Sequence, residues 1–213
     1  MVGLNSLLFY PRVMNAVITR AWWKILAAPA LAMFFMALLI PDYLARDGLR
    51  VDDLGFPSKW KARDIAQALA AGALIWFLQY SLLTLLCGYT GAHAVNVGWR
   101  HTYSLLGDRG PAEILGMRFA VIVAAPIIEE TVFRGCLITT LRAFYGSSAR
   151  NDCLFAAASG LLFAYVHQLG HPLFYPAYFL SGALLSFLYM RTGLLSSAIL
   201  AHAAMNMLGA LIT

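Results

Sequence analysis

Two adjacent acids and one arginine lie in an otherwise apolar stretch, where a charged side chain needs a partner or a chemical role. Glu129, Glu130 and Arg134 lie within the segment APIIEETVFRG. Residues four apart share one face of a helix, so Glu130 and Arg134 are expected to form an ion pair. Glu129 lies about 100° further round the helix and finds no partner on its own face. An unpaired carboxylate in an apolar setting is a stronger base than one in water, which suits general-base catalysis.

Three more polar residues occur on two later apolar segments. His167 ends the stretch FAYVH, and Asn206 follows His202 by four residues. A buried imidazole or carboxamide without a partner is costly, so we expect these groups to meet Glu129 in one polar cavity. There Glu129 would take a proton from water, and His167 would position that water or protonate a leaving amine. His202 and Asn206 would donate hydrogen bonds to an oxyanion, so the set suits hydrolysis of a peptide bond.

The elements that hold these residues are predicted to be membrane-spanning helices. Apolar residues make up 61% of the chain and charged residues 12%, against about 45–50% and 25% in soluble domains. Four runs contain no charged residue, namely 25–41, 65–99, 153–190 and 192–213. Their lengths approach or exceed the about 20 residues that cross a bilayer as a helix. This composition excludes an ordinary soluble protein. It predicts an all-α polytopic transmembrane helical bundle of about six spans, with a range of six to eight.

The charge pattern divides the chain into two regions. Residues 1–111 read as an N-terminal membrane region, with a surface segment, two spans and a polar loop over 41–63, and residues 112–213 read as a catalytic helical core. The six expected spans are 22–40, 64–89, 112–145, 152–168, 172–191 and 194–212. Within the core, Gly160 and Gly182 are expected at close helix contacts. Pro126 is expected to loosen its helix one turn before Glu129 and to free backbone groups.

The basic residues do not predict a nucleic-acid partner. The formal net charge is +5, but the Lys and Arg side chains are spread between the apolar runs and form no basic face or arm. We interpret them as charges that flank membrane spans. The expected partners are therefore the lipid bilayer and a membrane-associated protein or peptide substrate.

Three short motifs, in order along the C-terminal half, resemble those of the CPBP family of intramembrane proteases. This family includes type II CAAX-prenyl endopeptidases and bacterial bacteriocin-processing and immunity-related proteins. The motifs are Glu129-Glu130-x-x-x-Arg134, Phe163-x-x-x-His167 and His202-x-x-x-Asn206. The resemblance implies an active site enclosed by a membrane bundle, in a plasma membrane of the bacterial type. It further implies that Glu129 activates water beside His167, and that His202 and Asn206 stabilise the oxyanion.

Several alternatives remain open at this point. The family was long described as metalloproteases, and a Glu/His/His set could hold a divalent metal such as zinc. Because Asn206 is a poor zinc ligand and no HExxH motif occurs, we favour a mechanism that uses no cofactor. A non-enzymatic scaffold or immunity protein would keep the same residues to hold its helices together, and a transporter would use Glu129 as a proton carrier. The residues do not choose between prenylated and unprenylated substrates.

Overall fold

The computed structural model describes residues 22–46, 48–56, 61–90, 110–167 and 174–211. Within these ranges the regular structure is helical throughout, so the all-α prediction is confirmed for this part of the chain. The α-helices are α3 (Trp22–Arg46), α4 (Ala62–Thr90), α6 (Pro111–Phe119), α7 (Ala125–Glu130), α8 (Thr139–Tyr145), α9 (Ala149–Val166), α10 (Phe174–Thr192) and α11 (Leu195–Leu211). A short 3₁₀ turn, Val51–Leu54, follows α3.

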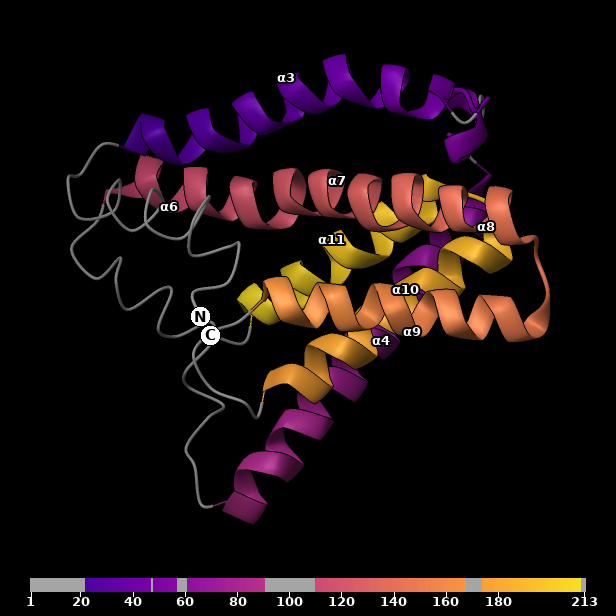
Figure 1. The fold of residues 1–213 in the computed structure, drawn as a ribbon. Coiled ribbons are helices and arrows are strands. Elements are labelled where there is room, and N and C mark those ends of the chain that lie inside the picture. Colours follow the sequence, from indigo (N-terminus) through magenta and orange to yellow (C-terminus); the bar gives the residue numbers. More distant parts are fainter. Residues whose placement is uncertain (1–21, 47, 57–60, 91–109, 168–173, 212–213) are drawn as a thin grey trace.

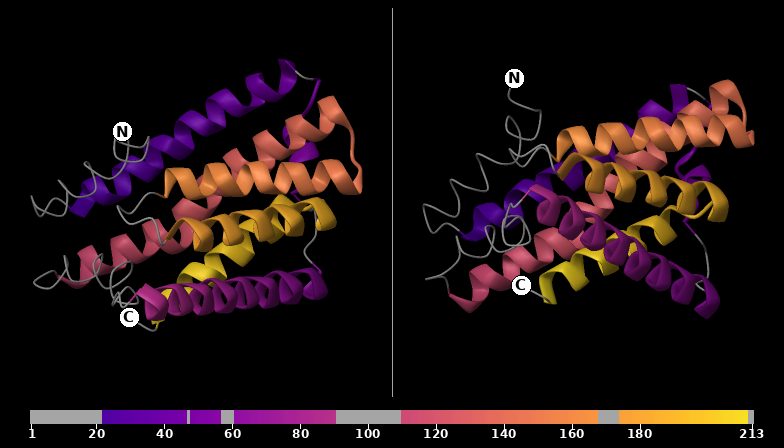
Figure 2. Two further views of the ribbon diagram at one scale, coloured as in Figure 1. Left: turned by 60° about the horizontal axis from the view of Figure 1, so that its bottom comes forward. Right: turned by 90° about the horizontal axis from the view of Figure 1, so that it is seen from below.

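The helices α6, α7 and α8 form one continuous rod through the bundle (Figure 1). Two π-helical stretches, Ala120–Ala124 and Thr131–Ile138, join the three helices and lie on either side of α7. Helix α3 packs along one side of this rod, while α4 packs against α10 and α11 on the opposite side of the bundle (Figure 2). The acidic pair at the end of α7 is therefore enclosed by helices from both halves of the chain.

The return from the rod into α9 is set by local polar contacts. The Ser148 side chain accepts a hydrogen bond from the Asn151 backbone N–H at 3.1 Å and caps the N-terminus of α9, as Ser commonly does. Arg142 near the end of α8 donates to both carboxylate oxygens of Asp152, at 3.0 and 2.7 Å. These contacts turn the chain back so that α9 runs beside the rod.

Helices α9 and α10 approach closely where each carries a glycine. A Cβ atom on Gly182 would lie 2.8 Å from the Cβ of Phe163 and 2.9 Å from the Cα of Gly160. A Cβ on Gly160 would lie 2.8 Å from the backbone oxygen of Phe179. The predicted close helix contact at these two glycines is confirmed. It brings the α10 backbone close to the rod, where the Gly182 carbonyl accepts a hydrogen bond from Arg134.

The first helix is longer than the sequence pattern predicts. We expected a polar loop from Pro41 onward, but α3 continues through Pro41 to Arg46, so that boundary was wrong. The reason is tertiary packing, because Leu44 is fully buried in a cluster with Leu54 and Ile138. Burying a leucine side chain is worth about 1.5–3 kcal/mol, which favours keeping the last turn of the helix in place.

Six long helical segments in the described part correspond in position to the six predicted spans. One described stretch, Ala62–Leu86, combines the length and apolarity of a span, with a mean hydropathy of 1.8. Within α4, Leu74, Phe77 and Leu85 expose 57%, 57% and 69% of their surface, as expected of a helix that faces lipid. The count of about six crossings and the division at residue 111 stay predictions.

Candidate active site

A buried ion pair lies within the rod, and its arginine also bonds to α10. Glu130 and Arg134 are both fully buried, and Arg134 Nη1 donates to Glu130 Oε1 at 2.8 Å. Arg134 also donates from Nη2 to the Gly182 carbonyl at 2.6 Å and from Nε to Ser186 Oγ at 3.3 Å. Glu130 and Arg134 thus lie in ion-pair contact, and two other nitrogens of the guanidinium donate to the neighbouring helix.

His202 is oriented by the same carboxylate. Its Nδ1 lies 2.8 Å from Glu130 Oε1, and the histidine side chain is 3% exposed. Because Arg134 already donates to Oε1, this oxygen is an acceptor and His202 Nδ1 carries the proton of the bond. The opposite ring nitrogen, Nε2, lies 3.9 Å from Glu129 Oε2. The buried pair therefore aims the His202 ring at the second acid.

His167 is oriented by its own helix and by two aromatic rings. Its Nδ1 lies 2.7 Å from the Phe163 carbonyl oxygen, which can only accept, so Nδ1 is the donor. The imidazole stacks on the Phe163 ring with centroids 4.2 Å apart and on the Tyr178 ring with centroids 4.9 Å apart. Its Nε2 lies 3.4 Å from Glu129 Oε2.

Glu129 is the point on which both imidazoles converge. Its Oε2 atom is buried and accepts no hydrogen bond from the described residues, whereas its side chain as a whole is 25% exposed. Buried carboxylate oxygens normally have a donor. A carboxylate oxygen faced by two Nε2 atoms can exchange a proton with either ring or with a water molecule beside them.

Asn206 reaches the rod one turn beyond His202. Its Nδ2 donates to the backbone carbonyl of Val121 at 2.9 Å, and the residue is 9% exposed. Val121 belongs to the π-helical stretch just before α7. The structure thus brings Glu129, His167 and His202 together, and it ties Asn206 to the backbone that leads into the acidic segment.

Sequence reasoning missed the residues that act through their backbone or through a ring face. The Gly182 and Val121 carbonyls and the Tyr178 ring all contact the predicted site residues. Pro126 was the available signal for Val121, because a proline inside a helix leaves a carbonyl without its donor. No pattern in the sequence pointed to Tyr178.

The metal alternative needs a set of ligands that the described residues do not provide. Across the described ranges, no group of three or more His, Cys, Asp or Glu side chains is arranged to hold a metal ion. The fourth polar side chain, Asn206, uses its amide nitrogen on the Val121 carbonyl. A catalytic zinc site needs three protein ligands around one point. We therefore derive no step through a metal.

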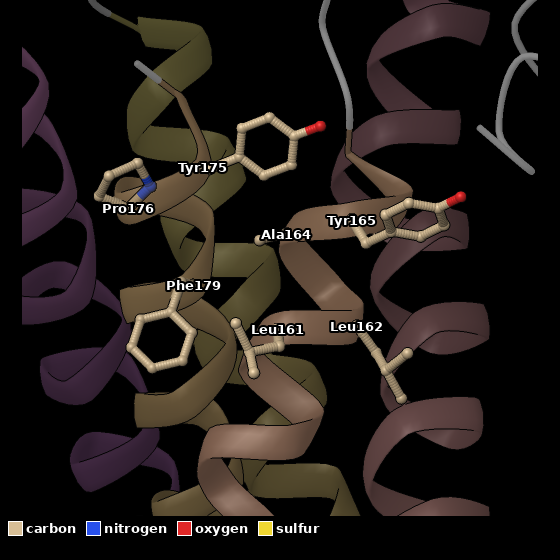
Figure 3. Close-up of a pocket in the computed structure, with 7 residues that line it drawn as sticks. All are labelled: Leu161, Leu162, Ala164, Tyr165, Tyr175, Pro176 and Phe179. Carbon is tan, nitrogen blue, oxygen red and sulfur yellow. The ribbon is translucent and has the colours of Figure 1, made fainter. Parts of the chain in front are cut away.

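An apolar groove of about 640 Å³ runs between α9 and α10. Figure 3 shows its lining side chains on the two helices. These are Leu161, Leu162, Ala164, Tyr165, Tyr175, Pro176 and Phe179. Leu162, Ala164 and Phe179 are sequence neighbours of the aromatic residues that stack on His167, so the groove lies along the same pair of helices that orients His167.

Comparison with known proteins finds a family match over the C-terminal part of the chain. Residues 111–208 match the family described as type II CAAX prenyl endopeptidase Rce1-like. The matched range contains both acids of α7 and the three polar residues of the later helices. Neither the comparison with curated proteins nor that with solved structures finds a match.

Proposed function

Because residues 111–208 match the type II CAAX prenyl endopeptidase family, we propose that this chain is a multi-pass intramembrane endopeptidase that uses a glutamate-activated water. Proteins of this family are membrane proteases. The observation that carries the finer proposal is the approach of two imidazole Nε2 atoms to Glu129 Oε2, at 3.4 Å for His167 and 3.9 Å for His202. The substrate of the proposed endopeptidase is a membrane-associated protein or peptide.

In the proposed reaction, Glu129 accepts a proton from a water molecule that contacts both its Oε2 and His167 Nε2 from the substrate side. The water oxygen bonds to the carbonyl carbon of the substrate, and the carbonyl electron pair moves onto the oxygen. His202, which is held by the Glu130 carboxylate at 2.8 Å, and the second N–H of Asn206 stabilise this oxyanion. The C–N bond then breaks as the proton passes from Glu129, directly or through His167, to the leaving amine.

In this proposal, the apolar groove between α9 and α10 binds the apolar part of the substrate. Its lining is aliphatic and aromatic, and its volume is about 640 Å³, within the range of small-molecule pockets. A prenyl group or an apolar peptide segment would both suit such a lining. We propose the plasma membrane of a bacterial-type cell as the location.

Identification of a cleaved protein tests the proposed function. We expect one small membrane protein to accumulate uncut in cells that lack this chain, as measured by mass spectrometry of membrane peptides. The purified chain in liposomes should then cut that protein at the same bond. A scaffold predicts no change in protein termini, and a proton-coupled transporter predicts uptake of a solute driven by a pH gradient. Either of those results without cleavage would contradict the protease proposal.

Metal removal tests the cofactor-free mechanism in the same liposome assay. Because the described side chains offer no three-ligand set, we expect the cleavage rate to stay within about two-fold after dialysis against EDTA or 1,10-phenanthroline. An authentic zinc protease assayed in parallel is the control for effective chelation. Loss of cleavage that one divalent ion restores, with that ion present in the purified protein at one per chain, would overturn the metal-free mechanism.

A further inference from the structure

The Val121 carbonyl lacks both of its helical donors. In an α-helix it would accept from the Ala125 N–H, but that N–H donates to the Ala120 carbonyl in the π-helical stretch. In a π-helix it would accept from residue 126, which is a proline and has no N–H. A carbonyl in the middle of a continuous rod is thus left to find a partner outside its own helix.

Asn206 on α11 is that partner. Its Nδ2 lies 2.9 Å from the Val121 oxygen. Because a carbonyl only accepts, the nitrogen side of the carboxamide must face the rod, which removes the usual ambiguity between the two ends of an Asn side chain. The bond fixes one N–H of Asn206 and sets the direction of the other.

We propose that Pro126 is a positioning residue, which keeps the Val121 carbonyl free so that Asn206 is held in one orientation. Pro126 is fully buried one turn before Glu129. Because Pro126 has no N–H, the Val121 carbonyl stays available to the Asn206 carboxamide on α11. Pro126 thus affects catalysis only through Asn206. This inference rests on the proposed function where it assigns Asn206 to the oxyanion.

The variant Pro126→Ala tests the proposal, because it restores an N–H that competes with Asn206 for the rod carbonyls. We expect the ¹H–¹⁵N signals of the Asn206 side chain, assigned by their loss in Asn206→Ala, to shift in Pro126→Ala. We also expect kcat to fall by about 10- to 100-fold with KM within about two-fold. Pro41→Ala is the matched control, since Pro41 is also inside a helix but lies on exposed α3, and it should leave both measurements unchanged.

A double-variant cycle separates positioning from a general structural role. If Pro126 acts through Asn206, the loss in kcat from Asn206→Ala is not deepened by adding Pro126→Ala. Losses that multiply, or Asn206 signals that do not move in Pro126→Ala, would overturn the proposal. If Pro126→Ala does not fold, Pro126→Gly supplies the same N–H and is measured in the same way. Failure of both to fold, with Pro41→Ala folded, would make the proline structural and also overturn it.

The spectroscopic arm keeps this inference distinct from the proposed function. Should no cleavage by the wild-type chain be found, the proposed function fails, but the Asn206 signals still report whether Pro126 sets their position. Should cleavage be found and the signals stay unmoved, the proposed function stands and the positioning role does not.

Discussion

Replacement of Glu129 by Gln is expected to lower kcat by about 10²- to 10⁴-fold in a protein that remains folded. The amide has nearly the shape of the carboxylate but does not accept a proton from water near neutral pH. Glu129 accepts no hydrogen bond at Oε2 from the described residues, and a quarter of its side chain is exposed, at 25%. The substitution leaves the buried pair of Glu130 with Arg134 in place, and we expect the thermal unfolding midpoint to change little.

Glu130→Gln is the matched control for this prediction. It makes the same chemical change one residue later, at a fully buried acid that pairs with Arg134 and His202. We expect it to lower the unfolding midpoint, in contrast to Glu129→Gln. Cleavage and thermal unfolding are measured on the same detergent preparations. Full cleavage of an established substrate by Glu129→Gln, or a loss of activity that only follows a loss of folded protein, would refute the role of Glu129 as the base.

The contacts that sequence could predict are those within one helix. Glu130 and Arg134 are four residues apart, and helical periodicity alone places them on one face, where the structure has them at 2.8 Å. Gly160 and Gly182 were likewise expected at close contacts, because small residues are typical of helix interfaces. In these cases the local period, or the small size of a side chain, determines the outcome.

The contacts that sequence could not predict depend on the rotation of one helix against another. His202 belongs to α11 and Glu130 to α7, and no spacing along the chain shows which ring nitrogen faces which oxygen. The same holds for Tyr178, which stacks on His167 from α10. The predicted end of α3 was wrong for a related reason. Burial of Leu44 against residues distant in the sequence outweighs the tendency of Pro41 to end the helix.

The second large effect is expected from Arg134→Met, which leaves Glu130 buried without its cation. Removing one partner of a buried ion pair costs about 3–5 kcal/mol, and Arg134 also supplies hydrogen bonds to Gly182 and Ser186 on α10. For a chain of this size, that loss corresponds to a fall in the unfolding midpoint of about 6–20 °C. The measurement is thermal unfolding of the purified protein in detergent.

Two further variants give this prediction its control and its sharpest test. Arg142→Met breaks another Arg–acid pair, but its partners are 26% and 22% exposed, so we expect a cost of only about 1 kcal/mol. The double variant Glu130→Gln with Arg134→Met removes the stranded charge as well, and it should be more stable than Arg134→Met alone. If the double variant is no more stable, the cost of Arg134→Met comes from lost packing and hydrogen bonds on α10. In that case the buried charge of Glu130 does not determine the stability of this site.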